Sequence, residues 1–230
     1  MNAFFEIPAV AELFALGGPV VLVLAAMSVL GLAIVMLKCW QFASVRINNR
    51  RFIEPALEQW RANRTKAVLQ ALEGKRSPIA VALYSAISGL NNGREQSVVR
   101  EESARVAAKQ LAELRSYFRP LEVIGILAPL LGLLGTVMGM IEAFRELEAA
   151  GSQVNPAILS GGIWEALLTT AVGLIVAIPA VAALNWLERM VERLHQDMQD
   201  ALTRVFTEQI GEQITAEPQE STLLQTAHAH

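Results

Sequence analysis

The chain has little charge, few aromatic residues and a single cysteine. Charged residues make up 18% and aromatic residues 6% of its 230 residues, whereas soluble domains carry about 25% charged residues. Hydrophobic residues make up 53% and the mean hydropathy is +0.38, so the apolar excess is aliphatic. This composition favours lipid-exposed helices over a large globular core. The single cysteine, Cys39, excludes an intrachain disulfide framework.

Several classes of protein need residues that this sequence lacks. The net charge is −3 and no basic face carries interspersed aromatic residues, which argues against nucleic-acid binding. The sequence contains no nucleophile–base pair, phosphate-binding loop or metal-ligand cluster. We therefore expect neither an enzyme nor a bound metal or cofactor. The absence of an internal repeat argues against a solute transporter that acts alone.

Three windows without charged residues are long enough to span a bilayer, whose core needs about 20 apolar residues in helical form. They are Leu13–Leu37, Val123–Ile141 and Ala166–Leu187, with 25, 19 and 22 residues. No Lys or Arg precedes the first window, so we expect a retained span there and not a cleaved signal peptide. The predicted fold class is an all-α integral membrane protein with three transmembrane helices, two of them extended into the cytoplasm.

Basic residues set the predicted orientation, because cytoplasmic segments are enriched in Lys and Arg. Fifteen of the 19 Lys and Arg residues lie between Lys38 and Arg119, and none precedes the first span. We therefore expect both long polar parts to face the cytoplasm. The predicted segments are an outer N-terminus at 1–12, transmembrane helices at 13–42, 121–141 and 165–187, a cytoplasmic helical domain at 43–120, an outer connector at 142–164 in which the third helix can begin, a cytoplasmic helix at 188–215 and a disordered tail at 216–230.

The polar parts are predicted to be helical. We expect residues 43–119 to have little core of their own, and residues 94–119 to form one long helix with a kink near Pro120. After the third span, apolar residues recur every three or four positions from Leu187 to Val205. Such a seam packs either on the chain's own cytoplasmic helices or against another subunit, and the sequence leaves both alternatives open.

Small residues recur on one face of the second and third spans, and such faces let membrane helices pack closely. The first span has fewer glycines, so we expect it to face lipid while the other two lie inside an assembly. The alternative is that the small residues only hold one subunit together. The expected helix-packing residues are Gly132, Gly135, Gly139, Gly173, Ala177 and Pro179.

Three polar residues lie in or beside these spans. Thr136 and Thr170 either line an ion path or bond their own helix backbone. Asn155-Pro156 is typical of a helix start, and Glu165 would lie about 15 Å along that helix unless Gly161-Gly162 breaks it. Because acidic groups in membranes usually face a cavity or a partner, Glu165 is a candidate functional residue.

Two motifs resemble the MotA/TolQ/ExbB proton-channel family. The first is Gly-Leu-Leu-Gly-Thr-Val-Met-Gly-Met at residues 132–140. The second is Glu-Ala-Leu-Leu-Thr-Thr-Ala-Val-Gly-Leu at residues 165–174, followed by Ala-Ile-Pro-Ala at 177–180 and by Asn185. The resemblance covers residues 13–210. It implies a stator subunit of the bacterial inner membrane, with a periplasmic N-terminus, a cytoplasmic C-terminus and five copies around a dimer of a single-span ExbD-like or TolR-like partner.

The resemblance also implies a mechanism. The partner supplies a membrane aspartate, Thr136 and Thr170 line its path, and Glu165 is the acidic residue of the third helix. Proton flow would move the partner and pass energy to a TonB-like or TolA-like protein that spans the periplasm. The short loop favours the ExbB and TolQ branches over MotA-type relatives. Gly17-Gly18-Pro19 and the Leu-Gly-Leu-Leu-Gly-Thr stretch at 131–136 resemble the ExbB branch, which energises outer-membrane transport such as siderophore uptake. The alternatives are a TolQ-like subunit of an envelope-integrity system and a non-conducting scaffold.

Helix geometry restricts these assignments. Glu165 and Thr170 are five positions apart, so at 100° per residue they point about 140° apart on a straight helix. Thr169 is four residues from Glu165 and shares its face. We therefore expect Thr170 to face the central pore, and Glu165 to act as a coupling or structural group directed at a neighbouring helix or subunit.

Overall fold

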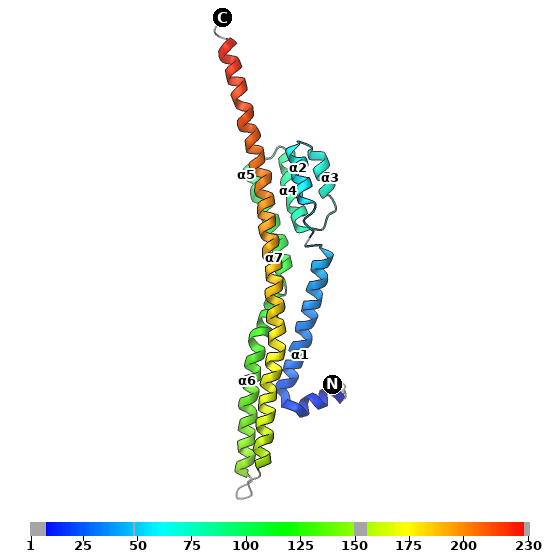
Figure 1. Cartoon of the computed structure of the whole chain (residues 1–230), viewed down its shortest axis with the longest axis vertical. Coiled ribbons are helices and arrows are strands. Elements are labelled where there is room, and N and C mark those ends of the chain that lie inside the picture. Colours follow the sequence, from blue (N-terminus) through cyan, green and yellow to red (C-terminus); the bar gives the residue numbers. More distant parts are fainter. Residues whose placement is uncertain (1–7, 48, 150–155, 228–230) are drawn as a thin grey trace. The chain divides into compact units, whose positions relative to one another are not determined.

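The computed structural model describes residues 8–47, 49–149 and 156–227, and side-chain surroundings within 18–207 except at residue 48 and residues 150–158. Every regular element among these residues is an α-helix (Figure 1), which confirms the all-α fold class. The helices are α1 (Pro8–Ser44), α2 (Ile53–Arg61), α3 (Thr65–Leu72), α4 (Pro78–Asn91), α5 (Gln96–Arg115), α6 (Phe118–Ala149) and α7 (Pro156–Ala227).

The chain divides into two compact units. The membrane unit combines the chain up to Cys39 with Tyr117–Leu187, and the polar unit combines Trp40–Ser116 with the chain from Glu188 onward. Three helical stretches are long and apolar enough to cross a membrane, and they lie within Gly18–Ser44, Gln96–Ala149 and Leu159–Thr207. The three predicted spans are therefore confirmed by helix length and composition.

The prediction of one long helix that runs from residue 94 through a kink near Pro120 is wrong. The structure has two separate helices there, α5 and α6. α5 ends at Arg115, Ser116 is extended (φ −54°, ψ 144°), and Tyr117 has a left-handed backbone with φ 65°. α6 starts at Phe118, which places Pro120 in its first turn, where a proline is tolerated because its missing N–H would lack a helical partner anyway. The break therefore lies before the proline and not at it.

α7 begins at Pro156, as predicted, and continues without a break through Gly161 and Gly162. The predicted capping residue Asn155 lies outside the described residues, as do the other residues between α6 and α7. At the other end the backbone of α7 stays helical to Ala227, although the sequence predicts disorder from residue 216. Most residues in this stretch favour a helix, whereas Pro218 within it does not.

The membrane unit has a small apolar core to which three helices contribute. Its buried residues come from α1, α6 and α7, and the remaining faces of these helices expose aliphatic side chains. On α1, for example, Leu24 is fully buried whereas Val29 is 70% exposed. One side of the first helix, which the sequence predicts to face lipid, is therefore buried against α6 and α7. The core residues are Val20, Leu24, Ile124, Ala128, Val176, Ala177 and Ala180.

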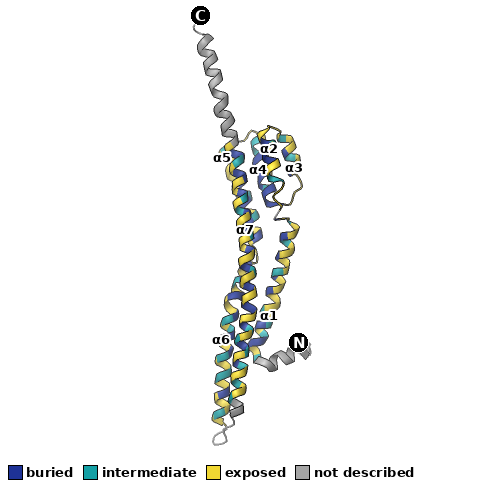
Figure 2. Cartoon of the chain, viewed as in Figure 1, coloured by how far each residue is buried: buried dark blue, intermediate teal, exposed yellow. Residues whose placement is uncertain are grey.

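The polar unit has a core of its own, contrary to the expectation from its sequence. Helix α4 packs against α3 and α5, and Figure 2 shows it as mostly buried. The apolar seam of α7 is also buried inside this chain at Val191, Leu194, Met198, Ala201 and Val205. The indole N–H of Trp60 donates to the carbonyl oxygen of Val205 at 3.3 Å. Of the two alternatives for the seam, packing within the subunit is therefore the one observed.

Candidate functional site

Glycines bring the backbones of α6 and α7 into direct contact. A Cβ atom added at Gly173 would lie 2.6 Å from the carbonyl oxygen of Ala128 and 3.2 Å from the Cα atom of Gly132. One added at Gly132 would lie 3.0 Å from the carbonyl oxygen of Thr169. Real Cβ atoms essentially never come within 3.0 Å of such an atom, so only glycine fits at position 173, and a side chain at position 132 would require its backbone neighbours to shift. The small-residue stripes of the two helices thus pack on each other within one chain.

The stripe continues on both sides of this contact. Gly135 faces the side chain of Thr169, and a Cβ at Gly139 would lie 3.3 Å from the Cβ atom of Ala166. Gly162 packs in the same way on Ala143, a contact that the sequence did not single out. Ala177 is buried in the core of the unit, whereas Pro179 is exposed.

The threonine hydroxyls divide into two kinds. Thr169 and Thr170 both donate across to the carbonyl oxygen of Gly132, at 3.3 and 3.2 Å, and Thr169 also donates to the carbonyl oxygen of Ala166 at 2.7 Å. Thr136 instead donates to the carbonyl oxygen of Leu133 in its own helix, at 2.6 Å. Each hydroxyl oxygen keeps acceptor capacity after it donates its one proton.

Glu165 and Thr169 lie beside a cavity of about 520 Å³ between α1, α6 and α7. Thr170 is not among the residues that line this cavity. The arrangement agrees with the angular argument, since Thr169 shares the face of Glu165 and Thr170 does not. The lining residues are Gly18, Pro19, Val20, Gly135, Met138, Gly139, Glu142, Ala143, Glu146, Gly161, Gly162, Glu165 and Thr169.

Two acidic residues of this cavity, Glu142 and Glu146, were not predicted from the sequence. Glu142 and Glu146 lie on the same side of α6 as Gly135 and Gly139, because the steps between them are three or four residues. That spacing is visible in the sequence, where Glu142 directly follows the second charge-free window. The sequence also did not indicate that Gly18 is a neighbour of Glu165. A Cβ atom added at Gly18 would lie 3.8 Å from the Oε1 atom of Glu165. Only the fold brings α1 to that position.

A buried lysine lies elsewhere in the membrane unit. The side chain of Lys38 is fully buried, and its Nζ atom lies 5.6 Å from the ring centres of both Tyr117 and Phe118. An ammonium group within about 6 Å of an aromatic face gains a favourable cation–π interaction. This contact ties the end of α1 to the start of α6. Within the described residues, no group of three or more His, Cys, Asp or Glu side chains is arranged to hold a metal ion.

These features define a class: a multi-pass membrane protein whose second and third long apolar helices pack through glycines and carry threonines and a glutamate. Residues 74–200 match the model of the MotA/TolQ/ExbB proton channel family, which is more than half of the chain. The chain therefore belongs to this family, as its two motifs suggested, and it is a non-enzymatic transport subunit.

Individual relatives carry ExbB names. The Vibrio cholerae biopolymer transport protein exbB1 is 38% identical over 108 residues, which are 46% of this chain and 47% of that protein. The ExbB-like 1 protein of Synechocystis is 32% identical over 178 residues, or 76% of this chain and 69% of that protein. The Neisseria gonorrhoeae biopolymer transport protein ExbB is 48% identical over 75 residues, which cover 33% of this chain and 34% of that protein. The chain thus spans about half the length of the Vibrio relative.

Proposed function

We propose that this protein is the proton-channel stator subunit of an inner-membrane motor that energises TonB-dependent outer-membrane transport. The observation that carries the proposal is the glycine-packed pair of α6 and α7, which holds Thr136, Thr170 and Glu165 in a chain of the proton channel family. Several relatives are named biopolymer transport protein ExbB, which favours this branch over a TolQ-like one.

The proposed partner is a dimer of a single-span, ExbD-like protein inside a ring of subunits, five by resemblance. A membrane aspartate of that partner would take up and release protons. The hydroxyls of Thr136 and Thr170 suit such a group, because a hydroxyl accepts a bond from a protonated carboxyl and, after rotation, donates one to a carboxylate. A TonB-like protein that spans the periplasm would receive the energy.

The exposed apolar surface supports an assembly in lipid. Leu133 of α6 and Ile175 of α7 are 58% and 69% exposed in the single chain. In the proposed ring these faces of α6 and α7 cover one another between subunits, while the exposed part of α1 faces lipid. The proposed localisation is the bacterial inner membrane, with residues 43–120 and 188–215 in the cytoplasm and residues 1–12 and 142–164 in the periplasm.

A deletion strain tests the function. Loss of energy-dependent siderophore uptake, restored by the gene on a plasmid, supports the ExbB-like assignment. Normal uptake together with a leaky outer membrane points to the TolQ-like alternative. Co-purification of a single-span protein with a membrane aspartate separates a motor from a scaffold, and its absence from the purified complex contradicts the proposal.

The orientation has its own test. Single cysteines at Gln59 and Ser152, each in a Cys39→Ala background, should react with a membrane-impermeant maleimide from opposite sides of the inner membrane. The expectation follows from the excess of Lys and Arg around Gln59. Reaction of both cysteines from the same side would overturn the three-span topology.

A further inference from the structure

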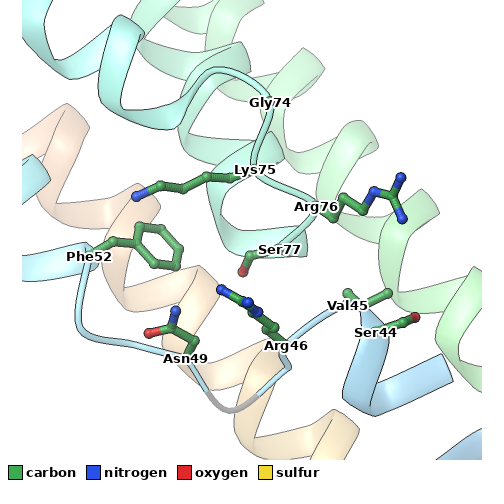
Figure 3. Close-up of a pocket in the computed structure, with 9 residues that line it drawn as sticks. All are labelled: Ser44, Val45, Arg46, Asn49, Phe52, Gly74, Lys75, Arg76 and Ser77. Carbon is green, nitrogen blue, oxygen red and sulfur yellow. The ribbon is translucent and has the colours of Figure 1, made fainter. Parts of the chain in front are cut away.

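The polar unit contains a cavity of about 310 Å³ with a basic lining. It lies where the chain leaves α1 and where the turn after α3 enters α4 (Figure 3). Three of the nine lining residues are basic, namely Arg46, Lys75 and Arg76, and none of the nine is acidic. The lining residues are Ser44, Val45, Arg46, Asn49, Phe52, Gly74, Lys75, Arg76 and Ser77.

The charges in this cavity are not compensated within the described part of the chain. The structure records no ion pair for Arg46, Lys75 or Arg76 there. In contrast, nearby Arg50 pairs with Asp197 at 2.6 Å. The ammonium of Lys75 lies 4.5 Å from the ring centre of Phe52, a cation–π contact that positions it without neutralising it. The cavity therefore presents net positive charge to any molecule that enters it.

A buried hydroxyl faces the same cavity. Ser77 is only 7% exposed and precedes α4 as its capping residue, yet its side chain makes no capping hydrogen bond. Among the described residues, no hydrogen bond is recorded for this hydroxyl. Figure 3 shows Ser77 and the guanidinium of Arg46 facing each other, with Asn49 beside them, while the guanidinium of Arg76 points outward. Because Ser77 lines the cavity, its hydroxyl can donate a hydrogen bond to a ligand oxygen that enters there.

The backbone conformation of Arg46 is a second, independent indication that its side chain has a role in this cavity. α1 ends in a Schellman motif: the backbone N–H of Arg46 donates to the carbonyl oxygen of Ala43, and that of Ile47 donates to the carbonyl oxygen of Phe42. The backbone of Arg46 is left-handed, with φ 50°. Glycine or asparagine usually occupies this position. The same motif after α2 and α4 has Asn63 and Gly93 there. An arginine in a conformation that disfavours it indicates that its side chain serves a purpose other than ending the helix.

From these observations we propose that the cavity binds a phosphate group, held by the side chains of Arg46 and Lys75 and by the hydroxyl of Ser77. Guanidinium and ammonium groups with a hydroxyl donor are the usual partners of phosphate oxygens. Arg46 is two residues beyond Ser44, the last residue of a candidate span, so it lies within about 7 Å of chain from that end. Because Arg46 follows a candidate span so closely along the chain, the phosphate comes either from an anionic lipid headgroup or from a soluble phosphate compound.

The test uses the full complex and two probes. Native mass spectrometry in mild detergent measures the binding of added phosphatidylglycerol, with phosphatidylcholine as the uncharged reference. Calorimetry of the complex in phosphatidylcholine nanodiscs measures the binding of inorganic pyrophosphate. The variant Arg46→Gln with Lys75→Gln should bind one probe about tenfold or more weakly, on the basis of several-fold per basic side chain. The matched control is Arg64→Gln with Lys66→Gln, which removes the same two side-chain types from the same unit.

A second variant separates binding from folding. Arg46→Gly should melt at the same or a higher temperature, because glycine suits the left-handed position, and should still bind the probe more weakly than the unaltered protein. Selective loss of phosphatidylglycerol binding identifies a lipid headgroup, and selective loss of pyrophosphate binding identifies a soluble ligand. Equal binding of both probes by the double variant and its control overturns the proposal. The proposal does not depend on ion flow through the membrane unit.

Discussion

The hydroxyl of Thr170 donates to the carbonyl oxygen of Gly132 at 3.2 Å, and so links α7 to α6 where glycines let the two backbones meet. Thr169 donates to the same oxygen at 3.3 Å. A polar link therefore lies inside an otherwise apolar contact, and one of its two donors, Thr170, is a residue that the family resemblance places on the proposed ion path. Helix packing and the proposed ion conduction consequently depend on atoms at the same helix contact. Separating the two roles needs some variants that change the packing and others that change the hydroxyl groups.

The glycine contact predicts a difference between two substitutions in α7. Gly173→Ala should destabilise the protein by about 1–3 kcal/mol, because the added methyl group would lie 2.6 Å from the carbonyl oxygen of Ala128. Gly161→Ala should be neutral or slightly stabilising, since no atom lies within 4 Å of the added carbon and alanine favours the helix. Thermal unfolding of both purified variants in detergent measures the difference. Equal melting temperatures would contradict the close packing of α6 and α7.

The double variant Thr136→Val with Thr170→Val should assemble but no longer drive uptake. Loss of one cross-helix hydrogen bond costs only about 0.6 kcal/mol on average in a membrane protein. An ionised group left without polar partners in hydrocarbon costs at least ~2.5–3.5 kcal/mol, which slows a cycle about a hundredfold or more. Energy-dependent siderophore uptake and native mass measure the two effects.

Thr207→Val is the matched control for the threonine variants. Thr207 bonds the carbonyl oxygen of Thr203 in its own helix, as Thr136 bonds Leu133, but it lies in the polar unit. The control should retain full uptake. Normal uptake by the double valine variant as well would exclude the two threonines from the mechanism and favour the scaffold.

Glu165→Gln should weaken assembly or coupling while leaving part of the ion flux. The carboxylate lines the cavity between α1, α6 and α7, whereas Thr170 does not line it. Glu148→Gln is the control, because Glu148 is an exposed acid of α6 that does not line the cavity. Native mass and proton flux into vesicles that contain the complex distinguish the two roles. Complete loss of flux with an intact ring would make Glu165 a proton carrier.

The polar unit should lose stability at acid pH through one ion pair. Arg204 donates to both carboxylate oxygens of Glu54, at 3.0 and 2.6 Å, and this hydrogen bonding, aided by the charge of Arg204, lowers the pKa of Glu54 below its ordinary value of 4.5. A lowered pKa in the folded state means that the pair stabilises the fold above pH 4.5. That stabilisation disappears as the pH falls through the lowered value.

Glu54→Gln should therefore flatten the fall in melting temperature as the pH drops below 4.5, because it removes the carboxyl whose lowered pKa links this ion pair to pH. Glu58→Gln is the control, since it removes the same charge from the same helix, α2. Circular dichroism at a series of pH values measures both melting temperatures. If both variants keep the pH dependence of the unaltered protein, the Glu54–Arg204 pair has no part in acid stability.

The sequence predicted the features that depend only on the length and spacing of residues along the chain. The three spans, the helix start at Pro156 and the small-residue stripes follow from windows and spacings that can be counted. The break at Ser116 and Tyr117 could not be predicted in this way, because no glycine or proline marks it. A tyrosine with φ 65° is held by the surrounding structure, here with Lys38 placed near its ring.

By itself the sequence determined the fold class, the family and the candidate residues Thr136, Glu165 and Thr170, because apolar length, helical periodicity and motif identity are properties of the chain alone. Only the tertiary structure decided which atoms meet. It joined the threonine hydroxyls of α7 to Gly132, brought Gly18 of α1 beside Glu165, and placed Arg46 next to Ser77. Such contacts join residues that are tens to over a hundred positions apart in the chain, and they arise from the packing of whole helices, which no local pattern encodes.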